Sequence, residues 1–380
     1  MPVPRPVFDQ NETLAVIAKE QRISAADHFG EPLDLWEKNL PAAFRDRAPR
    51  YPKLVLYETN HHLRAGGWDA HERLKDLALD GTSATVLYPT LGHDAWRLDD
   101  LELQEACIRV YNDYVIEQCS VAPERLWGLA MIPLGRIDHA IQELERCKKA
   151  GLRGAEIPVG QPLDNSYSSE RYGKFWAVAQ SLDMPINLHI NTGTDRIPQD
   201  KSGLLPYGVH KFDCMRVLGD LIVSGVMERY PDLKFVISEC GSGWIPFFAQ
   251  EFDYYMMGSS RQATLPRPPS EYLARQVYTV FIGDQVAGDL AEKYGKTNFM
   301  WSSDYPHPAC TWPNSAASIA QDLGHVSEET RANIVCNTAA AVYNSGQLPP
   351  PADPAPTDYQ PLDTWNYAVR TDYARVGVTA

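Results

Sequence analysis

Short, nearly continuous apolar runs separated by helical patterns dominate this chain. Eight such runs predict β-strands, at 22–26, 84–88, 126–132, 154–157, 185–189, 234–238, 277–281 and 299–302. Runs such as ATVLY and KFVIS do not alternate, which is typical of strands buried on both faces of a parallel sheet. Between most runs, apolar residues recur at three- and four-residue spacing and predict helices, as in 71–79, 101–121, 139–150 and 171–181.

This alternation predicts an α/β protein with a (β/α)8 TIM barrel, and a doubly wound open sheet is the alternative. Long connections follow the first, fifth and sixth strands, at the end of the barrel where active-site loops belong. Six prolines between 349 and 361 exclude regular structure there. We therefore expect an N-terminal arm at 1–21, a (β/α)8 barrel at 22–345 and an irregular proline-rich tail at 346–380.

The net charge and the cysteine content indicate which kinds of binding partner and cell compartment to expect. A net charge of -14 disfavours nucleic acids and anionic membranes as partners, and no apolar run is long enough to span a bilayer. The N-terminus lacks a signal-peptide core, and seven scattered cysteines without CxxC spacing are typical of reduced thiols. These features predict a cytoplasmic enzyme acting on a small molecule. Aromatic residues in the tail favour a homodimer or larger assembly with the tail at its interface; a tail packed on its own barrel is the alternative.

Four side chains able to bind a metal ion stand where predicted strands stop. They are His28, His189, Glu239 and Asp304. An ionised carboxylate at the mouth of an apolar barrel is costly unless it is paired or bound to metal, which favours a functional role for Asp304. Structural roles remain the alternatives for the others: a hydrogen-bonded His189, a Glu239 paired with arginine, and a His28 that only lines the pocket.

The first strand carries an irregularity in this pattern. Alternation places residues 26 and 28 on one face and Asp27 on the other, so a strand with two ligands would need one at position 26. That position holds Ala26. Asp27 could approach a metal only if the strand bends.

Other loop residues are candidates for catalysis and substrate binding. His307 and His210 are the best placed to act as general acid or base, and Asp284 is a weaker candidate. Arg64 and Arg196 are candidates for holding a substrate carboxylate. Aromatic side chains such as that of Trp244 are frequent in the predicted active-site loops and favour an aromatic or otherwise apolar substrate.

Four motifs in order along the chain resemble the amidohydrolase-related metal-dependent family, which includes hydrolases and the aminocarboxymuconate-semialdehyde and γ-resorcylate decarboxylases. They are SAADHFGEP at 24–32, NLHI at 187–190, SECGSGWIP at 238–246 and WSSDYPH at 301–307. The resemblance runs from about 22 to 343. It implies a TIM barrel with a divalent metal held by His28, His189 and Asp304.

Two positions depart from the family pattern. Ala26 stands where the family usually has Asp or Glu, and Glu239 stands where the named decarboxylases have His. Glu239 is therefore a further candidate ligand that restores the missing charge. The fourth strand has no lysine for a bridging carbamate, so one ion is expected, with a second as an alternative. The ligand types suit Zn, Fe or Mn without separating them.

On these grounds we expect a hydrolase. A metal-activated water would attack a C–N, C–S, C–O or C–C acyl bond, with Asp304 as general base and His307 or His210 protonating the leaving group. The alternative is non-oxidative decarboxylation of an aromatic or unsaturated acid on the same metal; Glu239 in place of histidine argues against it. A second alternative is a non-catalytic ligand-binding barrel, supported by Ala26 alone.

Overall fold

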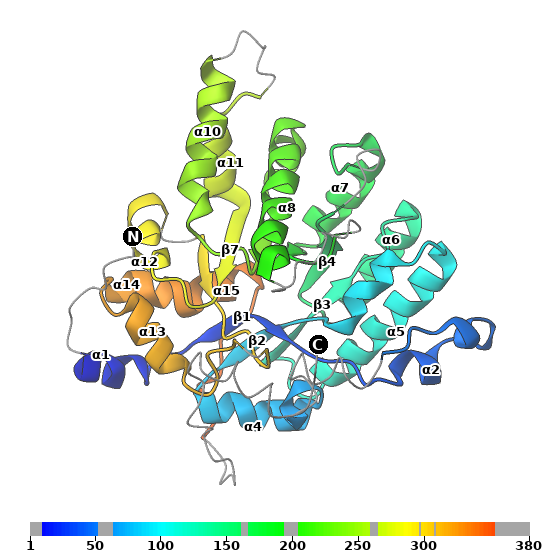
Figure 1. Cartoon of the computed structure of the whole chain (residues 1–380), viewed down its shortest axis with the longest axis horizontal. Helices are drawn as coiled ribbons and strands as arrows, with labels where there is room; N and C mark the ends of the chain where they lie inside the picture. The colour runs from blue at the N-terminus through cyan, green and yellow to red at the C-terminus, as the bar shows by residue number, and fades with distance from the viewer. Residues whose placement is uncertain are drawn as a thin grey trace.

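A computed structural model describes residues 10–51, 64–160, 166–193, 204–258, 265–295, 298–307 and 309–353. Its eight strands form one sheet in the order β1 to β8, and each pairs in parallel with the next (Figure 1). The strands are β1 (Ile23–His28), β2 (Ala84–Tyr88), β3 (Leu126–Met131), β4 (Gly154–Pro158), β5 (Ile186–His189), β6 (Phe235–Ser238), β7 (Val277–Phe281) and β8 (Phe299–Trp301). The predicted (β/α)8 barrel is confirmed, and the open-sheet alternative is wrong.

Helices surround the barrel and end where local sequence signals predict. Asp100 caps α5 by accepting hydrogen bonds from two backbone N–H groups, and Gly81 ends α4 in the left-handed conformation at φ 70°. The α-helices are α1 (Gln10–Ile17), α2 (Leu35–Asn39), α4 (Ala70–Asp80), α5 (Leu101–Cys119), α6 (Ile137–Lys149), α7 (Gly173–Ser181), α8 (Leu204–Val223), α9 (Val226–Arg229), α10 (Trp244–Gly258), α11 (Pro269–Gln276), α12 (Ala287–Tyr294), α13 (Ser315–Leu323), α14 (Glu328–Ala332) and α15 (Thr338–Val342). Shorter helical turns are η1 (Ala42–Arg47), η2 (Ala65–Gly67), η3 (Leu91–Arg97), η5 (Glu170–Tyr172) and η6 (Asn333–Asn337).

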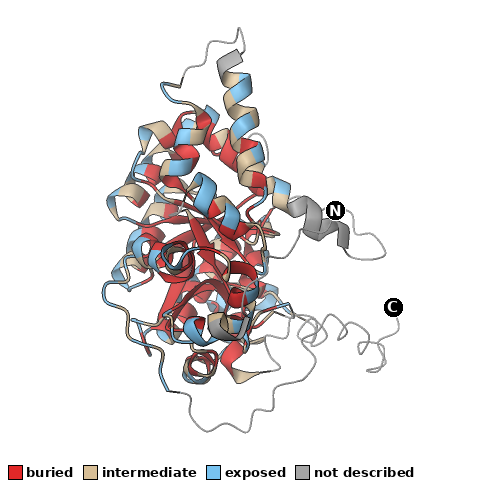
Figure 2. Ribbon diagram, turned by 90° about the vertical axis from the view of Figure 1, so that its left-hand side faces the viewer, coloured by how far each residue is buried: buried red, intermediate tan, exposed pale blue. Residues whose placement is uncertain are grey.

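The strands form the centre of the core. Every strand residue except Tyr278 is buried, as the nearly continuous apolar runs predict (Figure 2). The seven cysteines are all buried with free thiols. Among the described helices, none combines the length and apolar character that a membrane span needs.

Serine side chains close the barrel between β1 and β8. The Ser303 N–H donates to Ser24 Oγ (2.8 Å), and the Ser302 hydroxyl donates to the Ala26 carbonyl oxygen (2.5 Å). The pairing of β1 with β2 shifts register between Ser24 and Asp27, which is the bend that alternation alone does not predict. As a result β1 extends to residue 28 rather than stopping at 26, and its end lies beside the end of β8.

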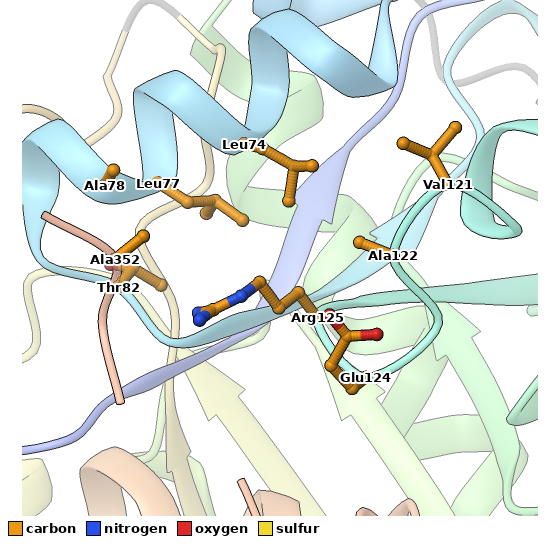
Figure 3. A pocket seen from close by; sticks show the side chains of 9 residues that line it. All are labelled: Leu74, Leu77, Ala78, Thr82, Val121, Ala122, Glu124, Arg125 and Ala352. Atoms are coloured by element: carbon orange, nitrogen blue, oxygen red, sulfur yellow. The ribbon is translucent and has the colours of Figure 1, made fainter. Parts of the chain in front are cut away.

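The opposite end of the barrel contacts the described start of the tail. Gln21 and Arg125 donate to the carbonyl oxygens of Pro349 (3.3 Å) and Pro350 (2.8 Å). A cavity of about 270 Å³ lies there, with Arg125 reaching across it (Figure 3). Its lining comprises Leu74, Leu77, Ala78, Thr82, Val121, Ala122, Glu124, Arg125 and Ala352. This cavity is at the N-terminal ends of β2 and β3, remote from the predicted active site. Tail residues 354–380 lie outside the described part.

Candidate active site

Imidazole and carboxylate groups converge at the C-terminal end of the barrel. Single donor atoms of His28, Glu239, Asp304 and His307 all lie within 4.8 Å of one another. His189 adjoins this group, because its Nε2 lies 2.9 Å from Glu239 Oε1, and the same oxygen lies 3.1 Å from His28 Nε2. The structure thus brings together the four side chains predicted as ligands and adds His307 from the loop after β8.

Backbone conformation aims the two carboxylates into this group. Glu239 and Asp304, just beyond β6 and β8, both have φ 60°, in the left-handed region that costs non-glycine residues free energy. The Asp304 N–H is satisfied by Ser302 Oγ (3.0 Å). Strain held at two strand ends in one cluster is typical of a functional site.

Hydrogen bonds on the far side of each ring orient the imidazoles. His28 Nδ1 lies 2.9 Å from the Pro89 carbonyl oxygen, and His189 Nδ1 lies 2.7 Å from that of Ile190. A carbonyl only accepts, so both Nδ1 atoms carry hydrogen and both Nε2 atoms face Glu239. If both imidazoles were neutral, the lone pairs of their Nε2 atoms would point at the Glu239 carboxylate. This arrangement requires a proton or a cation between the Nε2 atoms and the carboxylate. This donor set fits a divalent metal ion.

Charges in the cluster are strongly coupled. Burial alone would lower the pKa of His189, but the adjacent Glu239 carboxylate and its hydrogen bond raise that pKa to about 10. Burial disfavours the ionised form of Glu239, yet the imidazoles of His189 and His28 hold its pKa well below the ordinary range. Without a metal, Glu239 is therefore ionised and His189 carries a proton.

Asp304 and His307 form a second pair beside this charge. His307 Nδ1 lies 2.7 Å from Asp304 Oδ1. Burial raises the pKa of Asp304 to about 7, against the opposing effect of His307. Burial also acts to lower the pKa of His307, but the Asp304 carboxylate outweighs it and the net shift is upward. An acid with a pKa close to neutrality can give and take protons at physiological pH.

Asp27 has a structural role. Its Oδ1 accepts hydrogen bonds from the Ser24 hydroxyl (2.5 Å) and the Ser303 hydroxyl (2.6 Å), while its Oδ2 accepts one from Thr85 (2.7 Å). Arg73, which is fully buried, places Nη1 3.5 Å from Asp27 Oδ2. The bend in β1 therefore turns Asp27 toward the seam between β1 and β8, where it helps to close the barrel.

Two of the remaining predicted residues, Arg64 and Trp244, bind partners outside the cluster. The Arg64 guanidinium forms a paired contact with Asp76 (Nε to Oδ1 2.8 Å), and Trp244 Nε1 donates to the Gly241 carbonyl oxygen (3.0 Å). Arg196 lies outside the described residues, and His210 lies in α8 with an undescribed side chain. The roles of these four residues stay predictions.

Asp284 does not enter the cluster either. Its Oδ2 accepts hydrogen bonds from the N–H (2.8 Å) and hydroxyl (2.7 Å) of Ser242, and so organises the loop after β6.

A buried pair beneath the cluster was not predicted. His93 Nε2 lies 2.8 Å from Glu156 Oε1, and the His93 ring lies 5.1 Å from that of His189. Burial raises the pKa of Glu156 to about 8. The available signal was a carboxylate inside the apolar run 154–157, which is as anomalous there as a charge at a strand end.

Several known proteins similar to this chain are decarboxylases. A γ-resorcylate decarboxylase from Rhodococcus jostii is 28% identical over 257 residues, covering 61% of this chain and 74% of the relative. One from Rhizobium radiobacter is 26% identical over 338 residues, covering 79% and 93%. A solved dihydroxybenzoic acid decarboxylase from a Polaromonas species, with bound manganese and the inhibitor 2-nitroresorcinol, superposes with a TM-score of 0.63 at 21% identity, covering 86% and 97%.

These similarities correct the expected chemistry. The prediction of a hydrolase is wrong, because the relatives are decarboxylases and so favour the alternative reaction. The mild argument against decarboxylation from Glu239 does not outweigh them. That the relatives are enzymes also argues against a non-catalytic barrel. The sequence model for the amidohydrolase family matches residues 58–344, and the chain therefore belongs to the amidohydrolase family of enzymes.

Proposed function

We propose that this protein is a metal-dependent decarboxylase of an aromatic or unsaturated carboxylic acid. The observation that carries the proposal is the buried Asp304 carboxyl group, whose pKa burial raises to about 7, beside the candidate metal ligands. A carboxyl group in that state can supply the proton that decarboxylation requires. The reaction class of the similar proteins supports the same choice.

The protein groups that would hold a single ion are His28, His189, Glu239 and Asp304. A divalent ion bound there would act as a Lewis acid and neutralise anionic oxygens of the substrate. Of the three metals that the ligand types suit, manganese has the added support of the Polaromonas structure. His307 is the remaining member of the cluster and lies on its more exposed side, with 24% of its side chain exposed.

Asp304 and His307 would carry the proton transfer. Asp304 alternates between two states: as the carboxylate it would help to hold the ion, and once His307 has passed it a proton it is the acid that donates this proton to the substrate carbon bearing the carboxylate. The C–C bond then breaks, its electron pair returns to the substrate skeleton, and the carboxylate leaves as CO₂. His307, 2.7 Å from Asp304 Oδ1 and partly exposed, delivers a proton from solvent to restore the acid.

Turnover in isotopically labelled water tests the reaction class. Manganese-loaded protein would be incubated with γ-resorcylate and a panel of other hydroxylated benzene mono- and dicarboxylic acids. In D₂O we expect CO₂ release and one deuterium at the carbon that lost the carboxylate. In ¹⁸O-labelled water we expect no label in the aromatic product. Label in an acyl product, or no CO₂ from any acid of the panel, contradicts the proposal.

Variants then test the acid. Asp304→Asn cannot donate the proton and should lower turnover by roughly 10²–10⁴ while the fold is retained. The matched control is Asp289→Asn, which removes a carboxylate paired with His325 (2.9 Å) on the surface. Metal content of each variant should be measured, so that a lost proton donor is separated from a lost ligand. Full turnover in Asp304→Asn with bound metal would exclude Asp304 as the acid.

A further inference from the structure

A second cavity adjoins the candidate metal cluster. It encloses about 380 Å³, within the size range of small-molecule sites, and Glu239 forms part of its wall. The rest of the wall comes from the loops after β6 and β7, including Gly241, Gly283 and Asp284, and from Lys211 on α8. A molecule bound in this cavity would therefore lie against the metal cluster on one side and Lys211 on another.

Lys211 is the only cationic residue in the described lining of this cavity. Within the described part of the chain, its ammonium group forms no ion pair or hydrogen bond, although two carboxylates share the wall. Glu239 Oε1 is held by His189 (2.9 Å) and His28 (3.1 Å). Asp284 Oδ2 is held by the Ser242 backbone N–H and hydroxyl (2.8 and 2.7 Å). Both carboxylates are thus bound by residues other than Lys211.

The position of Lys211 is fixed by its backbone. Its carbonyl oxygen lies 4.0 Å from the thiol sulfur of Cys240, the residue after Glu239, so this turn of α8 packs against the end of β6. The Lys211 side chain is half-buried. A half-buried ammonium that has no partner among the described residues, on a helix beside the reacting site, suits an anionic ligand group.

The leaving carboxylate is a poor match for this cation. A lysine paired with the carboxylate that becomes CO₂ would lose its ion pair as the charge disappears, which raises the barrier. A lysine paired with a group that keeps its charge holds the substrate equally before and after the reaction. Lys211 therefore suits a second anionic group, which remains in the product.

We propose that Lys211 binds a second carboxylate of the substrate, so that the enzyme acts on a dicarboxylic acid and releases one of the two groups as CO₂. This inference rests on the proposed decarboxylase function. It assigns the substrate class through a residue outside the metal cluster. Lys211 is a binding residue in this scheme, and the proton transfer stays with Asp304 and His307.

Calorimetry with two matched ligands tests the inference. Benzene-1,3-dicarboxylate and 3-carbamoylbenzoate have nearly the same shape and differ by one negative charge. On the full chain, manganese-loaded and metal-free, we expect the diacid to bind about ten- to a hundredfold more tightly. Lys211→Met should abolish this preference, and Lys211→Arg should retain most of it. Lys293→Met, on α12 beside Tyr294, is the control and should leave the preference unchanged.

Three results would overturn the inference: equal affinities of the two ligands for the wild type, an unchanged preference in Lys211→Met, or no measurable binding of the diacid. None of them concerns the decarboxylase function, because that is decided by CO₂ release and deuterium incorporation. Conversely, the protein could prefer the diacid through Lys211 and yet release no CO₂. That result would support the role of Lys211 and contradict the proposed decarboxylase reaction.

Discussion

Replacing Glu239 by glutamine tests the electrostatic account of the site most directly. Glu239→Gln keeps the side-chain shape but removes the negative charge 2.9 Å from His189 Nε2. In the wild type this charge holds the pKa of His189 at about 10, against an ordinary value of 6.5. That rise corresponds to about 5 kcal/mol of interaction, at about 1.36 kcal/mol per pKa unit. It is large enough to decide the protonation state of the ring at any physiological pH.

In the variant His189 is still buried, and burial lowers its pKa. The charge of Glu156 still raises the pKa, but more weakly than Glu239 does in the wild type. We therefore expect the pKa of His189 to fall below about 7 in Glu239→Gln, which leaves a neutral ring at pH 8. The measurement is a pH titration of ¹⁵N-labelled histidine by NMR on metal-free protein. The His189 signal is assigned by its loss in His189→Gln.

The control is Asp289→Asn, which removes a surface carboxylate beside His325 and should leave His189 unchanged. A neutral His189 at pH 8 in the wild type would refute the reasoning, because the carboxylate then exerts little influence. A cationic His189 at pH 8 in Glu239→Gln would refute it equally, by placing the source of the charge elsewhere.

Three further predictions concern the metal, the barrel seam and the tail. Below the Asp304 pKa of about 7, Mn²⁺ must displace a proton from Asp304 as well as the one on His189, so its affinity should rise more steeply with pH below 7 than above it. Calorimetry should find about one more proton released per ion at pH 6 than at pH 8, and equal release would contradict this. Arg73→Leu leaves Asp27 buried without its cation and should lower the free energy of unfolding by about 3–5 kcal/mol in urea, whereas a loss below about 1 kcal/mol would argue against that pairing. Ending the chain after Gly346 should dissociate the predicted homodimer in sedimentation experiments, and an unchanged mass would refute a role of the tail in the interface.

The fold was predictable because parallel strands buried on both faces leave a simple signature. A run such as 84–88 has no polar face, so its type and limits follow from the sequence, and β2 matches it. The first strand was predicted less well. Its register shift between Ser24 and Asp27 coincides with hydrogen bonds to Ser302 and Ser303 just after β8, and a contact between the two ends of the barrel leaves no local pattern.

The site was predictable where one residue stands at one strand end. His28, His189, Glu239 and Asp304 were found in this way, because the ends of parallel strands meet at one rim. The geometry of the cluster was not predictable. Sequence does not show that Glu239 lies between two imidazoles.

The roles of Glu156 and Lys211 were not predictable from the sequence, for a different reason. The first lies inside a strand and the second in a helix, and each acquires its significance only from neighbours far away in the sequence.

Ala26 departs from the family pattern by lacking a carboxylate, and Glu239 departs from it by adding one. Ala26 is fully buried and has no ligand atom to offer, so the carboxylate that the family usually carries on β1 is missing. Glu239 supplies a carboxylate from β6, and a single oxygen of it contacts the imidazoles from both β1 and β5. Two imidazoles with two carboxylates can neutralise a divalent ion, whichever strand supplies the charge. A carboxylate is thus available at the end of β6 although β1 offers none, so the missing β1 carboxylate does not by itself argue against a metal site.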